Sequence, residues 1–405
     1  MRYFWVVAAW SLLFAARPAQ AGVALSAAGV QDRLMIVFKP GVTETQQRQM
    51  AAAYGLEVLR VFRPMRALVV RAKPNQARMM TIRLGYEPSV LLTGRDFYTK
   101  WIESSPESLQ ARPMPTLGSV MERLPELSPD LGKKPSEVQW GVQRVNAPAA
   151  WAANQGKGVK VAIVDTGIDP SHPEFAGRIM GGYNAIDEDS PWHDDHFHGT
   201  HVAGIVAAAR DGQGVVGVAP EAHLYAVKVL TKDGSGSLFG IMGGIMWCVE
   251  NGMQVVNMSL GAAQGHPLFE HAVNALADAD IPLIAAAGND GKAVNFPAKY
   301  AAAIAISALD EKDGIAKFSS RGPEIEFIAP GVKVPSTITG GGIKAYSGTS
   351  MATPHVTGLA ALAIAAGAQG QAGVRQALSS AAVKIEGLSP TEQGSGVTDA
   401  GQLVR

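Results

Sequence analysis

The chain has 405 residues, enough for two or three domains, and its 35 basic and 35 acidic residues give a formal net charge of zero. This balance argues against nucleic acid as a partner, and no acidic run forms a tail. With 47% apolar and 17% charged residues, the composition is that of a globular protein with a large core. The single cysteine, Cys248, allows no internal disulfide and is expected to be a small buried residue.

The first residues, MRYFWVVAAWSLLFAARPAQA, contain an arginine at position 2, an apolar run and a small residue on each side of Gln20. This arrangement predicts a secretory signal peptide over residues 1–21, because the apolar run is too short for a membrane span. An uncleaved amphipathic anchor is the alternative. We therefore expect a secreted protein, extracellular or periplasmic, with no stable membrane span.

Residues 22–101 are predicted to form a small α+β domain. Its apolar runs and amphipathic stretches predict the order β-α-β-β-α-β, which is ferredoxin-like. The predicted strands are RLMIVFK, LEVLRVF, RALVVRA and SVLLTGRDF, and the predicted helices are TETQQRQMAAAYG and NQARMMTIRL. Residues 102–135 follow with several prolines among polar residues, a composition typical of a linker that proteases cut easily.

From residue 136 to residue 405, apolar β-branched runs alternate with helical stretches. Such alternation predicts an α/β fold with a doubly wound, mostly parallel sheet, and a site at the carboxyl ends of its strands. The predicted strands are VKVAIVD, HLYAVKVL, VVNMSL, IPLIAAAG and AAAIAISAL, and the helices HVAGIVAAA, SLFGIMGGIMWCVENG and HPLFEHAVNALADAD.

Three stretches carry the residue types of nucleophilic catalysis. In GTSMATPHVTG, Ser350 stands at the predicted start of a helix, with Pro354 expected in its first turn. Asp165 ends a predicted strand, and His198 lies in HDDHFHGTHVAG. A hydroxyl, an imidazole and a carboxylate are the set that a serine nucleophile needs. Taken singly, however, the serine also fits a helix cap and the aspartate a turn.

These stretches, together with AAAGND at 285–290, resemble the Asp, His, Ser and oxyanion-hole blocks of the subtilisin-like serine proteases, in that family's order. The resemblance covers residues 136–405 with specific motifs, and residues 34–101 more loosely. It implies that Ser350 is the nucleophile, His198 the general base and Asp165 the group that orients it. Asn289 would donate to the oxyanion, and His201 would be structural.

The resemblance also implies a zymogen. Residues 22–101 would be a propeptide that acts in cis as folding helper and temporary inhibitor, although a permanent accessory domain stays open. The catalytic domain would act as a monomer on extended polypeptides, which two edge segments would bind through main chain. The predicted substrate-binding residues are Gly234, Ser235, Gly236, Ser259, Leu260 and Gly261.

The loop ARDGQGVVGVAP resembles the calcium-binding loop of the same family. Structural calcium would be held by carboxylates and backbone oxygens, with a further ligand near Ser136 or Gln139. The predicted ligands are Glu174, Ala209, Asp211, Gln213 and Val215.

Two other functions stay open at this point. His193, His196, His198 and His201 lie close together with two aspartates, so zinc hydrolysis has to be considered. It would leave the serine block unexplained, and the chain has no HExxH or CxxC motif. A protease-like domain retained only for binding is the second alternative. No catalytic metal is expected.

Overall fold

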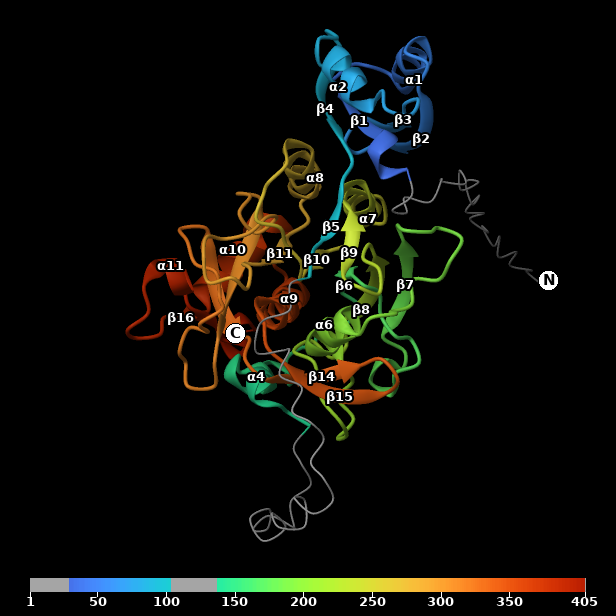
Figure 1. Ribbon diagram of the computed structural model, residues 1–405. Helices are drawn as coiled ribbons and strands as arrows, with labels where there is room; N and C mark the ends of the chain where they lie inside the picture. The colour runs from blue at the N-terminus through green and yellow to red at the C-terminus, as the bar shows by residue number, and fades with distance from the viewer. Residues whose placement is uncertain (1–28, 103–136, 405) are drawn as a thin grey trace, which may run out of the picture.

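The computed structural model describes residues 29–102 and 137–404. The predicted signal peptide and almost all of the predicted linker lie outside these ranges. A small N-terminal unit and a larger α/β body make up the described chain, and the first lies against two helices of the second (Figure 1).

The N-terminal unit is an antiparallel sheet in the order β2-β3-β1-β4, covered on one face by two helices. The predicted ferredoxin-like order of elements is present. Thr43 caps the first helix through the backbone N–H of Gln46, whose own side chain accepts from the Thr43 N–H. The elements are η1 (Val30–Asp32), β1 (Arg33–Phe38), α1 (Glu44–Ala53), β2 (Glu57–Phe62), β3 (Ala67–Arg71), α2 (Ala77–Gly85) and β4 (Val90–Arg95).

The body is built on a parallel seven-stranded sheet in the order β13-β12-β11-β10-β6-β8-β7. The predicted doubly wound α/β class is confirmed. Two strands of this sheet were not predicted: β7 contains two glycines, and β13 carries a glutamate and ends on a proline. The strands are β6 (Lys160–Asp165), β7 (Ile179–Asn184), β8 (His223–Lys228), β10 (Val255–Met258), β11 (Leu283–Ala286), β12 (Ala303–Leu309) and β13 (Ile325–Pro330).

Helices cover both faces of this sheet, and the alternating side chains of β6 show why. Val161 and Ile163 pack into the cluster with α6 (His198–Ala207) and α9 (Thr349–Ala365). Ala162 and Val164 pack into the cluster with α7 (Leu238–Glu250) and α8 (Pro267–Asp278). Because both faces are buried, the strands read as continuous apolar runs. Cys248 is buried in α7, as predicted.

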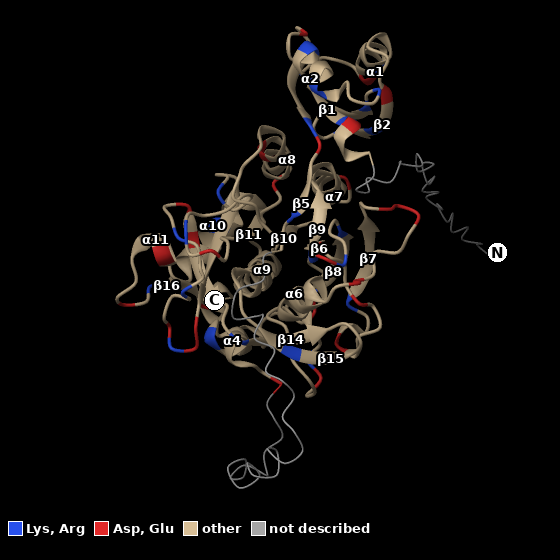
Figure 2. Ribbon diagram, in the orientation of Figure 1, with Lys and Arg blue, Asp and Glu red and all other residues tan. Residues whose placement is uncertain are grey.

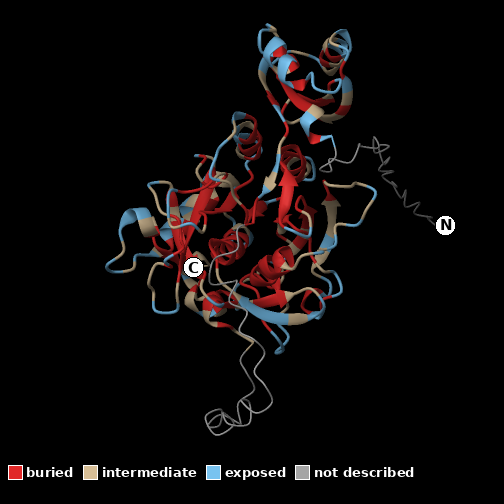
Figure 3. Cartoon of the chain, in the orientation of Figure 1, coloured by how far each residue is buried: buried red, intermediate tan, exposed pale blue. Residues whose placement is uncertain are grey.

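Smaller elements complete the body. They are α4 (Trp140–Arg144), α5 (Ala147–Ala150), η2 (Pro173–Phe175), β14 (Val334–Ile338), β15 (Gly342–Tyr346), α10 (Gly370–Ser380), β16 (Ala382–Val383), α11 (Pro390–Gln393), β17 (Val397–Thr398) and α12 (Ala400–Leu403). Charged residues lie mainly on the loops and on the N-terminal unit (Figure 2), whereas α6, α7, α9 and the central strands are largely buried (Figure 3). Within the described ranges no single helix is long and apolar enough to cross a membrane.

A short strand joins the two parts. β5 (Tyr98–Lys100) pairs antiparallel with β9 (Ser235–Ser237), with Thr99 opposite Gly236. Beyond this pair, the sheet of the N-terminal unit packs on α7 and α8. The side chains that it contributes to their shared buried cluster include Met35, Val37, Phe62 and Val69. The N-terminal unit therefore has one core of its own and a second that it shares with the body.

Candidate active site

Asp165 and His198 form a buried pair at the carboxyl end of β6. His198 Nδ1 lies 2.9 and 3.0 Å from the two carboxylate oxygens of Asp165, whose side chain is fully buried. The backbone N–H of Thr166 also donates to Asp165, at 2.7 Å. These contacts orient the imidazole so that Nε2 is its free end, and Nε2 has no hydrogen-bond partner among the residues that the structure describes.

The close approach of α6 to β6 depends on a glycine. Gly199, the second residue of α6, lies against the carbonyl of Gly167, and a Cβ at position 199 would collide with that oxygen. Its N–H donates to the hydroxyl of Thr166 at 3.0 Å. The HGTH and DTG motifs are therefore packing partners as well as carriers of His198 and Asp165.

Ser350 is the second residue of α9, the helix that packs against α6. Its hydroxyl donates to the carbonyl of Ser259 at 3.0 Å, so it is not directed at His198 in the structure. Ser259 directly follows β10, and β10 pairs with β6, which ends at Asp165. The serine therefore lies at the same carboxyl edge of the sheet as the Asp165–His198 pair.

A proline inside α9 shapes the surroundings of the serine. Pro354 was expected in the first turn, and this prediction is wrong, because the helix begins at Thr349 and Pro354 lies inside it. The missing N–H of Pro354 leaves the Ser350 carbonyl without its helical donor. The hydroxyl of Ser259 donates to that carbonyl instead, at 3.0 Å.

Asn289 follows β11 and is fixed by the residue that precedes Ser350. Its side-chain oxygen accepts from the N–H of Thr349 at 2.8 Å and from the Thr349 hydroxyl at 3.0 Å. Asn289 and Ser350 both line the same pocket. With Oδ1 held in this way, the amide NH₂ is the end of the side chain that can donate to an anion beside Ser350.

Asp194 holds the loop before His198. Its carboxylate accepts from the N–H groups of His196, Phe197 and Thr200 and from two hydroxyls, at 2.6–3.2 Å. A carboxylate in this place satisfies N–H groups that have no partner within α6. Sequence reasoning missed this positioning role, although an aspartate shortly before a helix is a capping signal.

Lys228 is a second charged residue that holds this part of the chain. It is buried at the end of β8, and its ammonium group donates to the carbonyls of Thr166 and Leu230 and to the carboxylate of Asp195, at 2.6–3.0 Å. Burial of an ammonium group costs free energy unless such partners are present. Lys228 thereby joins the turn after Asp165 to the loop that Asp194 fixes. Sequence reasoning missed this role as well, because nothing near Lys228 in the chain indicates it.

The other histidines of this segment differ in environment. Burial lowers the pKa of His201 to about 3, and its Nε2 lies 2.9 Å from the carbonyl of Lys344. Burial also lowers the pKa of His196, whose Nδ1 accepts from the His198 N–H at 3.3 Å. His193 is exposed. In the described ranges no three His, Cys, Asp or Glu side chains are grouped so that they could hold a metal ion.

Residues 98–102 lie between the two segments predicted to bind substrate, residues 234–236 and 259–261. Trp101 donates its N–H to the carbonyl of Gly234 and accepts from the N–H of Gly261, both at 2.9 Å. Its indole N–H donates to the carbonyl of Gly236 at 3.0 Å, and the ring is buried. Sequence reasoning did not single out Trp101, because its partner Gly236 lies 135 residues further along the chain.

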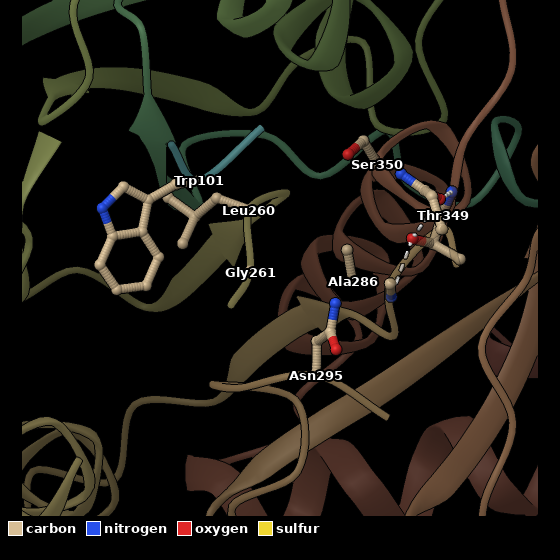
Figure 4. Close-up of a pocket in the computed structure, with 9 residues that line it drawn as sticks. Trp101, Leu260, Gly261, Ala286, Asn295, Thr349 and Ser350 are labelled. Carbon is tan, nitrogen blue, oxygen red and sulfur yellow. Dashed lines mark hydrogen bonds between the residues drawn. The ribbon is translucent and has the colours of Figure 1, made fainter. Parts of the chain in front are cut away.

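A pocket continues from this segment toward Ser350. Figure 4 shows Trp101 and Leu260 on the side of the pocket opposite Thr349 and Ser350, with Ala286 and Asn295 between them. Its complete lining is Trp101, Leu260, Gly261, Ala286, Gly288, Asn289, Asn295, Thr349 and Ser350. The walls are mainly apolar or main chain, so the pocket fits an uncharged side chain.

The predicted calcium loop packs around Glu174. Burial is the main cause that raises the pKa of Glu174 to about 7, and the nearby carboxylates of Asp211 and Glu137 raise it further. Its Oε1 accepts from the N–H of Val215 at 3.3 Å, and its buried Oε2 has no partner in the described part of the chain. This unsatisfied oxygen fits a cation.

The other predicted calcium ligands make hydrogen bonds within the same region. The N–H of Ala209 donates to the carbonyl of Glu174 at 2.9 Å, and the Asp211 carboxylate accepts from the N–H of Gln213 at 3.0 Å. The side-chain amide of Gln139 is already occupied, because its NH₂ donates to the carbonyl of Val216 and its oxygen accepts from the N–H of Val216. The alternative ligand at position 136 lies outside the described residues.

An aspartate, a histidine and a serine thus lie at the carboxyl edge of a doubly wound sheet. Beside them, residues 98–102 occupy the space between the edges at residues 234–236 and 259–261, which we call the groove. Together the aspartate, histidine and serine supply the three side-chain types that a serine nucleophile needs. Residues 156–397 match the model of the subtilase family, and the chain belongs to that family.

Three relatives illustrate the similarity. A thermostable alkaline protease of Halalkalibacterium halodurans is 50% identical over 56% of this chain and 62% of its own length. Subtilisin E of Bacillus subtilis is 46% identical over 56% of this chain and 60% of its own length. The minor extracellular protease Epr of the same organism is 44% identical over 55% of this chain and 35% of its own length. The chain thus spans less than two thirds of the length of each of these relatives.

Proposed function

We propose that this chain is a serine endopeptidase that hydrolyses peptide bonds through an acyl-enzyme. The observation that carries the proposal is the buried Asp165–His198 pair at the sheet edge where Ser350 lies in the first turn of α9. The Nε2 of this pair has no partner within the described ranges. The proteases among the relatives support the proposal. Binding alone does not require a carboxylate buried against an imidazole, so we favour catalysis over a domain retained only for binding.

The chemistry follows from the positions of the donors. The Ser350 hydroxyl turns from the Ser259 carbonyl to His198, whose Nε2 takes the proton as Oγ attacks the substrate carbonyl. Asp165 accepts from Nδ1 and stabilises the imidazolium. The oxyanion receives hydrogen bonds from the Asn289 amide and the Ser350 N–H. His198 then protonates the leaving amine, and water repeats the sequence on the acyl-enzyme.

The groove points to extended polypeptides as substrates. Residues 98–102 lie between the two edges as an added strand, and the contacts are mostly main chain to main chain. A peptide from another protein would use the same donors and acceptors, with little dependence on its sequence. We therefore propose broad cleavage, with an uncharged side chain in the pocket beside Asn295.

The same contacts support a zymogen. While residues 98–102 occupy the groove, no substrate can pair there, so the N-terminal unit would inhibit the body until it is removed. It also covers apolar surface of α7 and α8. A parallel sheet has many long-range contacts and folds slowly, so a docked unit would stabilise the folding intermediate.

Calcium is proposed as a structural ion at the Glu174 loop. Because no three acidic, histidine or cysteine side chains of the described ranges are grouped so that they could hold a metal ion, backbone carbonyls would supply most of the ligands. Glu137, which sequence reasoning missed, adds negative charge and accepts from the Gly212 N–H at 2.7 Å. The carboxylate ligands would be Glu174 and Asp211, and the backbone ligands Ala209, Gln213 and Val215.

Secretion is proposed from the signal-like segment that precedes Gly22, and the similarity to the minor extracellular protease Epr supports it. A monomer is proposed from the family resemblance. Neither secretion nor a monomeric state depends on the geometry of the site, so either proposal can be wrong while the proposed reaction still holds.

Two reactions test the proposed activity. The full chain, activated to constant rate, should cleave an unfolded protein substrate, and Ser350→Ala should abolish cleavage. A serine-directed phosphonate should label the active chain once and not the variant. Cleavage that survives Ser350→Ala, or that a zinc chelator removes, would contradict the proposal.

A further inference from the structure

Phe197, directly before the proposed general base, has a backbone conformation that phenylalanine rarely adopts. Its φ is 151° and its ψ is −22°, and it is the residue from which α6 begins. Positive φ at a bulky residue costs free energy and persists only where the surroundings impose it. Glycine would adopt such a conformation at little cost. The chain therefore keeps a ring here despite the strain.

The ring is held in a stack of three. Phe197 stacks on His196 at 4.3 Å between ring centroids, with an interplanar angle of 21°. It also stacks on Tyr346 at 4.6 Å, with an angle of 18°. His201, one turn along α6, meets the same Tyr346 ring edge-on at 5.2 Å. Tyr346 thus contacts the start of α6 at two points.

This stack joins the two segments that carry the reacting groups. Phe197 is the neighbour of His198 in the chain, and Tyr346, the last residue of β15, stands shortly before Ser350. No backbone hydrogen bond links residues 196–198 to residues 346–350 among those that the structure describes. Asp194 holds the Phe197 N–H at 3.2 Å but belongs to the same loop. The ring contacts therefore connect the two segments where the backbone does not.

We propose that Phe197 is a positioning residue, whose ring, clamped between His196 and Tyr346, sets the distance from the His198 imidazole to the Ser350 hydroxyl. The inference rests on the proposed proteolytic function. In the structure that hydroxyl bonds the Ser259 carbonyl, and it must find Nε2 at hydrogen-bond distance when it turns. Small errors in such a distance lower the rate of the chemical step more than they weaken binding.

The experiment compares Phe197→Gly, Phe197→Tyr and Tyr346→Leu, with His193→Ala as a control at an exposed residue of the same loop. Each full-length variant is activated, and its active sites are counted by phosphonate labelling. We measure kcat, KM and melting temperature on a peptide that continues beyond the cleaved bond. The same constants are measured on a peptide anilide, which has no residue beyond that bond.

For Phe197→Gly we expect kcat to fall about tenfold on both substrates. KM should change less than about twofold, and the melting temperature should stay equal or rise because the strain is relieved. Phe197→Tyr, which keeps a stacking ring, should stay near the wild type. Tyr346→Leu should show the same fall in kcat. In the double variant, Phe197→Gly with Tyr346→Leu, kcat should fall no further.

Three results would overturn the proposal. Full kcat in Phe197→Gly would show that the ring positions nothing. A fall confined to the longer peptide would make Phe197 part of a binding surface for the leaving segment, and a parallel fall of melting temperature would make its role purely structural. If the wild-type chain itself is inactive, the proposed function fails and this inference fails with it. If the wild type and Phe197→Gly are equally active, only this inference fails.

Discussion

Ser259 and Ser350 exchange two hydrogen bonds at the edge of the sheet. Each hydroxyl donates to the carbonyl of the other residue, both at 3.0 Å. One bond replaces the helical bond that Pro354 cannot make, and the other gives the proposed nucleophile a resting partner. Asn257 donates to the Ser259 hydroxyl at 3.0 Å, and Thr357 of α9 donates to Asn257 at 2.9 Å. The start of α9 is thereby fixed to the edge of β10.

Ser259→Ala should therefore destabilise the chain and lower kcat. The buried carbonyl of Ser350 would lose its donor, which costs about 1–3 kcal/mol in the free energy of unfolding. Urea unfolding and steady-state kinetics measure the two effects. Pro354→Ala in the same chain restores a helical N–H for that carbonyl, so the double variant should recover part of the lost stability. Stability equal to the wild type in Ser259→Ala would show that the bond is dispensable.

Asn289→Leu should lower kcat and leave KM nearly unchanged, because the oxyanion forms only after binding. Removal of such a donor from a subtilisin costs about 10²–10³ in kcat, and we adopt that magnitude rather than derive it. Asp290→Asn, in the adjacent turn, is the matched control. Since the leucine would also leave the Thr349 N–H without its acceptor, the melting temperature is measured alongside. Unchanged kcat would remove Asn289 from the oxyanion site.

Glu174 should make stability depend on both pH and calcium. Its folded pKa of about 7 lies above the ordinary value of 4.5, because burial disfavours the ionised form. The stability that this group contributes is complete below about pH 4.5 and is lost as the pH rises through about 7. With a chelator, the melting temperature should therefore fall between about pH 5 and pH 8, and calcium should oppose this fall.

The variant Glu174→Gln separates this site from other effects. It should flatten the pH dependence in chelator and lose most of the response to calcium. Glu311→Gln changes an exposed carboxylate and should behave like the wild type. A calcium response of full size in Glu174→Gln would place the ion elsewhere.

Asp96 links the N-terminal unit to the first turn of α7. Its carboxylate accepts from the Phe239 N–H at 3.0 Å and pairs with Arg33 at 2.9 Å. Burial raises the pKa of Asp96 to about 6, against the effects of Arg33 and of the hydrogen bonds. Because Phe239 of the body covers Asp96, we expect undocking to expose this carboxylate and to return its pKa toward the ordinary value. Docking should then weaken as the pH rises through about 6.

We expect the lag before the full chain becomes active to be shorter at about pH 8 than at about pH 5. Asp96→Ala should shorten it at both pH values, because leaving the buried Phe239 N–H without its acceptor costs about 1–3 kcal/mol. Asp96→Asn keeps an acceptor without a charge, so its lags at the two pH values should differ less than those of the wild type. Glu57→Gln, at an exposed residue of the same unit, is the control. A lag in Asp96→Ala equal to that of the wild type would show that this carboxylate does not hold the unit in place.

Local patterns were sufficient for most of the architecture. Runs such as VKVAIVD predict buried parallel strands because a strand covered on both faces needs apolar side chains at every position. The β-α-β-β-α-β order of the N-terminal unit follows from the same reasoning. Strand β7 could not be predicted in this way, since it contains two adjacent glycines and gains its order by pairing with β8.

The sequence by itself determined the family, the sheet and the residue types at the site, because each is encoded in short motifs and local periodicity. Only the tertiary structure decided which groups meet: Ser259 with Ser350, Phe197 with Tyr346, Trp101 with Gly234 and Gly261, and Glu137 with the Glu174 loop. Ser259 and Ser350, for example, are separated by 91 residues. Such contacts depend on how distant elements pack against one another, and a local pattern of side chains does not predict that packing.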